Sequence, residues 1–135
     1  MNTDFNKMTS EELCEYVCSY DFQTYRDINP KDLKWSYNPK YSIDNINIPT
    51  ISQKEDWIEW ISKEQEIFAS EMSYDRYAEV EEYWIPNPYE EPIIMIRYLD
   101  GTNDISDGWH RTGLAFKNNF KTIPVVMGTE KICND

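Results

Sequence analysis

The sequence predicts a small α+β domain, in which a mixed sheet with its own helix follows a series of acidic amphipathic helices. Two patterns predict this fold class. The last third of the chain contains apolar β-branched runs, a hairpin signal, a helical pattern and a final apolar run, and two capping boxes further upstream each precede apolar residues at helical spacing. With 135 residues, the chain is long enough for one core and short for two, so we expect a single domain over 1–135.

Residues 1–50 are expected to form a helix and loop extension. The capping box from Thr9 to Glu12 precedes Leu13 and Val17 at helical spacing, which predicts a short amphipathic helix. Further on, Asn29-Pro30 is a possible helix start, and prolines at 39 and 49 act as breaks. We therefore expect a short helix, then a loop with an edge strand.

Residues 51–91 are expected to form acidic helices. The capping box Ser52 to Glu55 starts a helix of about four to five turns, with a wide apolar face and a Glu59–Lys63 pair at i,i+4. A third helix is predicted over 75–84, capped by Ser73 and ended by Pro86 and Pro88. The aromatic residues of this region lack interleaved basic residues, which favours a core position over a base-stacking platform; they are Trp57, Trp60, Tyr77 and Trp84.

Residues 92–135 are expected to form the sheet and its helix. The run from Pro92 to Ile96 predicts a buried strand, Asp100-Gly101 a hairpin, and 102–106 the returning strand. After a turn at Asp107-Gly108, a helix to about Asn119 and a strand over 122–127 follow. We expect five apolar residues to share one core: Ile94, Ile96, Ile105, Leu114 and Val125.

Charge is concentrated in the middle of the chain. Residues 55–91 contain twelve acids and two bases, whereas residues 92–135 contain five of each. A domain that binds nucleic acid through its phosphates usually has a basic surface, so this distribution argues against direct DNA binding. Helices within 55–84 are either a solvated face or a surface that docks a basic protein or imitates nucleic-acid phosphates.

Other function classes receive little support from the residues. No run approaches the roughly 18 apolar residues that span a bilayer, and the first ten residues do not resemble a signal peptide, so we expect a cytoplasmic protein. Cys14 and Cys18 share a helix face, Cys133 is remote, and the only histidine is His110. This pattern favours ordinary thiols over a disulfide scaffold or a metal site.

The turn Asp107-Gly108-Trp109-His110-Arg111 has the chemistry of an anion site. A glycine between a strand and a helix lets a ligand approach the backbone, and the first helical amides favour negative charge. His110 and Arg111 add donors with reach to phosphate oxygens. The same residue types also serve as ordinary surface or salt-bridge groups.

This turn and its flanks resemble the ParB/sulfiredoxin superfamily. The matching strings are Glu91 to Ile96, Ile105 to Arg111, Ala115, and Lys121 to Val125, about 35 to 40 residues at the C-terminus; Arg76 matches loosely. The resemblance implies that Gly108, His110 and Arg111 contact the phosphates of a nucleoside triphosphate with Mg²⁺, with Trp109 and Thr112 beside them. It also implies hydrolysis or phosphoryl transfer, with His110 and Asp107 as catalytic candidates.

One departure limits the resemblance. Trp109 stands where sulfiredoxins have their nucleophilic cysteine, so thiol-dependent reduction is not expected. The Arg-rich box of chromosome-partitioning relatives is also missing, whereas small-molecule kinases of the superfamily leave phosphoryl transfer open. Two residues have plainer alternatives, since Trp109 can be packing rather than a lid over a base and Asp107 can be a helix cap. The alternative function is a non-enzymatic interaction protein of phage or mobile-element type.

Overall fold

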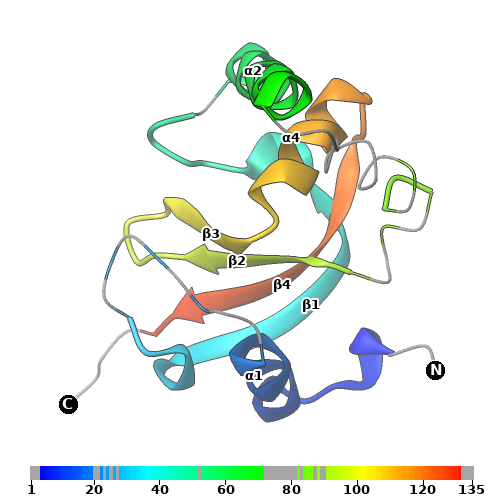
Figure 1. Ribbon diagram of the computed structural model, residues 1–135. Coiled ribbons are helices and arrows are strands. Elements are labelled where there is room, and N and C mark those ends of the chain that lie inside the picture. The colour runs from blue at the N-terminus through cyan, green and yellow to red at the C-terminus, as the bar shows by residue number, and fades with distance from the viewer. Residues whose placement is uncertain are drawn as a thin grey trace.

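In the part of the chain that the structure describes, four strands form one mixed sheet with helices on both faces (Figure 1). The computed structural model describes residues 4–19, 22, 24, 26, 28–51, 53–71, 82, 84–86, 88 and 91–131. Within them the strands are β1 (Leu33–Ser42), β2 (Ile93–Arg97), β3 (Asn103–Asp107) and β4 (Thr122–Glu130). The helices are α1 (Ser10–Cys18), α2 (Lys54–Glu71) and α4 (Trp109–Lys117), with 3₁₀ turns η1 (Phe5–Lys7), η2 (Pro30–Asp32) and η3 (Ile43–Asn45). The expected α+β class is confirmed.

The C-terminal unit has the predicted order of elements. The strands lie in the order β1-β4-β2-β3, with β2 antiparallel to β3 and parallel to β4. The hairpin at Asp100-Gly101 joins β2 to β3, where Gly101 has a φ of 87°. Helix α4 then returns the chain so that β4 pairs with β2.

Strand β1 is longer than expected. Pro39, which was expected to end a segment, lies inside the strand. Its pairing with β4 is antiparallel and shifts between Asn38 and Tyr41, so that residues 39 and 40 of β1 oppose only Pro124 of β4. This is a bulge, and neither Pro39 nor Pro124 has a backbone N–H to donate to the ladder. The two prolines therefore meet where the ladder is already interrupted, and the strand continues on either side.

The expected single core is wrong, because the sheet is covered on both faces. Side chains of successive strand residues point to opposite faces. Ile105 and Val125 pack on the side of α2 and α4, whereas Ile94 and Ile96 pack on the side of α1. Leu114 packs with Ile61 between α2 and α4. The continuous apolar run of β2 is that of a strand buried on both sides.

Several expectations about the N-terminal two thirds can be compared with the structure. The Thr9 capping box is present, with reciprocal bonds to Glu12 of 3.1 and 3.0 Å. Lys63 donates to Glu59 over 2.8 Å. Trp57 and Trp84 are buried, and Trp60 packs against the core. The Ser52 cap, the helix predicted over 75–84 (except Glu82 and Trp84), Arg76, Tyr77 and Cys133 lie outside the described residues.

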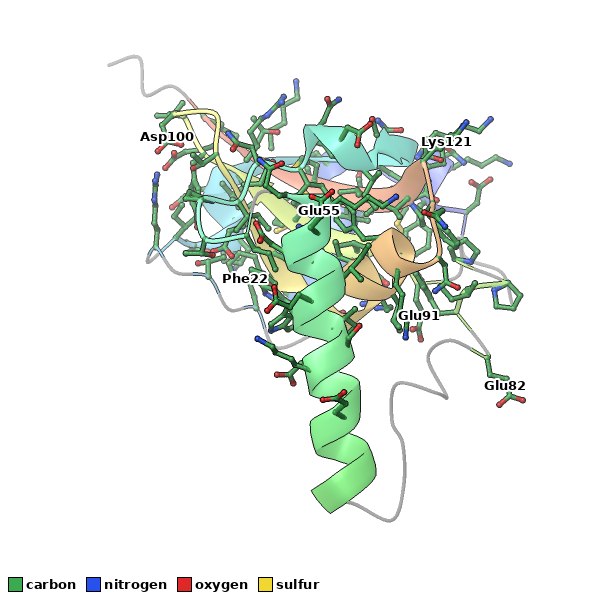
Figure 2. The ribbon with its side chains drawn as sticks, turned by 90° about the horizontal axis from the view of Figure 1, so that it is seen from above. Phe22, Glu55, Glu82, Glu91, Asp100 and Lys121 are labelled. Atoms are coloured by element: carbon green, nitrogen blue, oxygen red, sulfur yellow. The ribbon has the colours of Figure 1, made fainter. Side chains whose placement is uncertain are left out.

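Helix α2 extends beyond the sheet. Figure 2 shows its first turns, near Glu55, over the sheet and its C-terminal half projecting past it. The buried side chains Trp57 and Ile61 lie in the first half. In the part of the chain that the structure describes, no helix is long and apolar enough to cross a bilayer.

Candidate functional site

The strand-to-helix turn is built around Gly108. This residue is the N-cap of α4, with φ 111° and ψ 22°, a backbone conformation that side chains disfavour. A Cβ at this position would lie 2.6 Å from Cδ1 of Ile93 and 3.3 Å from Nη2 of Arg111. Glycine is therefore required both by the turn and by the side chains that pack against it.

Arg111 is bound by groups of the protein itself. Its side chain is only 11% exposed. One guanidinium nitrogen, Nη1, donates to the carbonyl of Glu91 over 2.6 Å, and Nη2 donates to Asp107 Oδ2 over 2.7 Å. The arginine expected to grip a phosphate thus ties the segment before β2 to the end of β3 and the first turn of α4.

Asp107 is the partner of Arg111 rather than the cap of α4. Its side chain is 41% exposed and lies one helical turn before the arginine. The N-cap of α4 is Gly108, which has no side chain to form a capping hydrogen bond, and the first turn of the helix contains no acidic residue. The helix-cap interpretation of Asp107 is therefore wrong. Its exposed carboxylate remains available to a ligand or to solvent.

Two aromatic side chains of the turn pack on α2. Trp109 donates from Nε1 to the carbonyl of Ile105 over 2.8 Å, and its ring stacks on Trp57 with centroids 5.6 Å apart. The ring of His110 lies parallel to that of Trp60, at an angle of 4° and a centroid distance of 5.4 Å. Trp109 is thus a packing residue, and His110 is oriented by an aromatic neighbour from α2.

Thr112 faces inward. Its side chain is fully buried, and its hydroxyl donates to the Gly108 carbonyl over 2.8 Å. The amide of Thr112 donates to the same carbonyl over 2.9 Å. Thr112 therefore stabilises the turn from inside, and its side chain presents no exposed surface to a ligand in this structure.

The electrostatics of the turn are mixed. The first three amides of α4, from Trp109 to Arg111, have no acceptor within the helix, and the helix end favours an anion. Two carboxylates at the turn oppose that preference, because their negative charge repels an anion and offsets the charge of Arg111. Asp107 pairs with Arg111, and Glu91 Oε2 lies 3.9 Å from Arg111 Nη1. Among the described residues no three His, Cys, Asp or Glu side chains are placed to hold a metal ion. Main-chain amides are therefore the principal donors that the turn offers to a phosphate.

Sequence reasoning missed two neighbours of the turn. Glu91 contributes its carbonyl to Arg111, and Trp60 contributes the ring on which His110 lies. Both depend on contacts between segments that are remote in sequence. Two local patterns could have pointed to these contacts. Glu91 directly precedes Pro92 at the entry to β2, and Trp57 and Trp60 are spaced i,i+3 on one helix.

The acidic surface of α2 is a second candidate site. Among the α2 side chains that the structure describes, four carboxylates belong to exposed residues: Glu55, Asp56, Glu59 and Glu66. A hydrogen bond from Lys63 lowers the pKa of Glu59 below its usual value.

On the other face of the sheet, burial raises the pKa of the Cys14 thiol, with Cys18 adding to the shift, so this thiol is less reactive than a free one.

Comparison with known proteins does not assign a family or a function to this chain. Neither the family models, nor the curated proteins, nor the solved structures contain a match to this chain.

Proposed function

We propose that the chain binds the phosphate groups of a nucleotide at the N-terminus of α4. The observation that carries the proposal is the start of α4: a left-handed glycine as N-cap, which brings no capping side chain of its own, and no acidic residue in the first helical turn. The resemblance of the Asp107 to Arg111 string to nucleotide-binding members of the ParB/sulfiredoxin superfamily supports the same ligand. His110 lies at this turn as a further donor.

In this proposal Arg111 is a positioning residue. Its guanidinium donates to Asp107 and to the Glu91 carbonyl and so maintains the shape of the turn. Its positive charge attracts a phosphate bound nearby without contacting it. A Mg²⁺ ion would reach the site bound to the nucleotide phosphates, with Asp107 and Glu91 as carboxylates at the turn. Hydrolysis or phosphoryl transfer would then require His110 or Asp107 to touch the reacting groups.

The test exploits the carboxylate that opposes anion binding. Asp107→Asn removes one negative charge beside the turn and releases Arg111, and both effects favour an anion. For a phosphate roughly 6 Å away at a partly exposed site, one charge corresponds to about 1 kcal/mol, or about five-fold in affinity. Calorimetric titration with ATP, CTP, GTP and ADP in the presence of Mg²⁺ measures this change.

The control is Asp32→Asn, which makes the same change of net charge in η2, beside α1 on the other face. We expect Asp107→Asn to bind more tightly, His110→Ala more weakly and Asp32→Asn like the wild type. Release of inorganic phosphate in the same samples shows whether binding leads to turnover. Equal gains in both Asp→Asn variants, or no binding by the wild type, would contradict the proposal.

A second candidate function is favoured by the exposed acids of α2. We propose that this helix, which projects beyond the sheet, docks a basic protein (Figure 2). Exposed charges are screened by salt, so capture of a partner should weaken between about 50 and 300 mM salt. Changing Glu55, Glu59 and Glu66 to Gln should have the same effect. A partner retained equally under all these conditions would exclude docking through these charges.

A further inference from the structure

Strand β1 lies at an edge of the sheet and leaves part of its surface uncovered (Figure 1). Its pairing with β4 places three of its residues on the same face as Val125 and Met127, which belong to the core beneath α2 and α4. All three are polar and exposed: Lys34, Ser36 and Asn38. This face of the sheet is therefore apolar and buried on β4 but polar and exposed on β1.

A second cation extends this polar strip across the sheet. Lys34 pairs with Thr129 of β4, and Thr129 pairs in turn with Arg97 of β2, so the three residues form one row on the same face. Adjacent strands lie about 4.8 Å apart, which separates the Cα atoms of Lys34 and Arg97 by roughly 10 Å. Both cations are exposed, and Thr129 lies half-buried between them. We call Lys34, Thr129 and Arg97 the cationic row.

The charges of the cationic row are not used inside the described part of the protein. The other two arginines that the structure describes each pair with an aspartate at 2.7 Å. Neither Lys34 nor Arg97 has a salt bridge or a side-chain hydrogen bond to any described residue. The strand residues that share this face on β1, β4 and β2 include no acid. In a chain with 25 acids and 13 bases, two such cations on one surface favour an external anionic partner.

The edge of β1 beside the cationic row is closed to an additional strand. The backbone N–H of Leu33 donates to the Pro30 carbonyl. The backbone N–H of Trp35 donates to the Ser10 hydroxyl over 2.9 Å. Because neighbouring segments already bind these main-chain donors, a partner at this end of β1 is recognised through side chains on the face of the sheet.

We propose that the cationic row binds an acidic peptide segment in extended conformation, with carboxylates at positions i and i+2. Such side chains lie on one face of the peptide roughly 7 Å apart, and the flexible stems of lysine and arginine close the remaining gap. Thr129 and Ser36 add hydroxyl donors. A surface of exposed strand residues suits a peptide better than a small molecule, since small ligands bind in concave sites. The net charge of −12 repels such a partner at long range, but salt screens this repulsion beyond about 8 Å at physiological ionic strength.

The experiment is an NMR titration of the ¹⁵N-labelled protein with the end-blocked peptide Gly-Glu-Thr-Glu-Gly. One matched peptide has glutamine in place of both glutamates, and a second, Gly-Glu-Glu-Thr-Gly, turns the two carboxylates to opposite faces of an extended chain. Glutarate supplies two carboxylates without a peptide. We expect the first peptide to bind most tightly and to shift the amides of 33–37, 96–98 and 128–130 at millimolar concentration. Shifts located elsewhere, or equal binding of any of the three matched probes, would overturn the proposal.

Two substitutions at exposed positions assign the interaction to the cationic row. Lys34→Gln and Arg97→Gln each remove one exposed ion pair with the peptide, which corresponds to a loss of about three- to five-fold in affinity. Lys40→Gln makes the same change of charge at an exposed position beside the bulge of β1 and should leave binding unaltered. Equal losses in all three variants would indicate general charge attraction and refute the site, as would unchanged binding by Arg97→Gln. Neither result bears on nucleotide binding at α4, whose first turn lies beside the start of β2 rather than its end.

Discussion

The strongest test of the glycine turn is the replacement of Arg111 by methionine, which keeps the apolar stem and removes the guanidinium. Two charge-assisted hydrogen bonds are lost, at 2.6 Å to the Glu91 carbonyl and at 2.7 Å to Asp107. A hydrogen bond to a charged group contributes about 1.5 to 3 kcal/mol when it is buried. Because the side chain of Asp107 is 41% exposed, water replaces part of the interaction that this carboxylate loses. We expect the free energy of unfolding to fall by about 2 kcal/mol.

Urea denaturation followed by tryptophan fluorescence measures this loss. Arg97→Met is the matched control, because Arg97 ends the neighbouring strand with an exposed side chain, and it should change stability by less than about 0.5 kcal/mol. A double-mutant cycle with Asp107→Asn should give a coupling of about 1 kcal/mol. If Arg111→Met were as stable as the wild type, the arginine would not hold the turn, and a direct role in gripping phosphate would regain support.

Two further predictions concern pH and packing. Burial, and to a lesser extent the hydrogen bond to Asp104, raise the folded-state pKa of Tyr98 to about 12, above its ordinary value of 10.0, so its contribution is complete below pH 10 and is lost as pH rises to 12. The stability advantage of the wild type over Tyr98→Phe should therefore shrink by roughly 2 to 3 kcal/mol across this interval in urea titrations, and a constant difference would contradict the shift. At Gly113, a Cβ would lie 2.9 Å from the branched Cβ of Ile61 and 3.3 Å from the ring of Trp60. Gly113→Ala should lower the melting temperature at a cost of about 1 to 2 kcal/mol, since overpacking outweighs the gain in helix propensity, and an unchanged or higher melting temperature would show that α2 can move away.

The contrast between β1 and the C-terminal unit shows what local patterns can predict. The strands and helix after residue 92 were predicted because apolar runs, an Asp-Gly turn and helical spacing are all local signals. Strand β1 was predicted only as a loop with an edge strand, because Pro39 marks a break. Its ten-residue length depends on pairing with β4, where Pro39 and Pro124 meet at the bulge, and no local pattern contains that register.

The candidate site was predicted in part. Gly108 was expected at a tight strand-to-helix turn, since a glycine after a strand has few other uses, and the structure places it there with a positive φ. The interaction between Arg111 and the Glu91 carbonyl was not predicted. That bond joins residues 20 positions apart and arises only when β2 and β3 pair. The residue type predicted a phosphate contact, whereas the fold uses the same donors internally.

The sequence by itself determined the α+β class, the helix start at Thr9, the hairpin at Asp100-Gly101, the glycine of the turn and the acidic surface of α2, because each depends on neighbouring residues or on composition. The tertiary structure alone decided which face each strand residue covers, which groups Arg111 and Thr112 bind, and that Lys34 and Arg97 flank Thr129 in one row of the sheet. These features depend on strand register and helix packing. The distance between two side chains that are remote in sequence is set only when the strands pair and the helices pack on the two faces of the sheet.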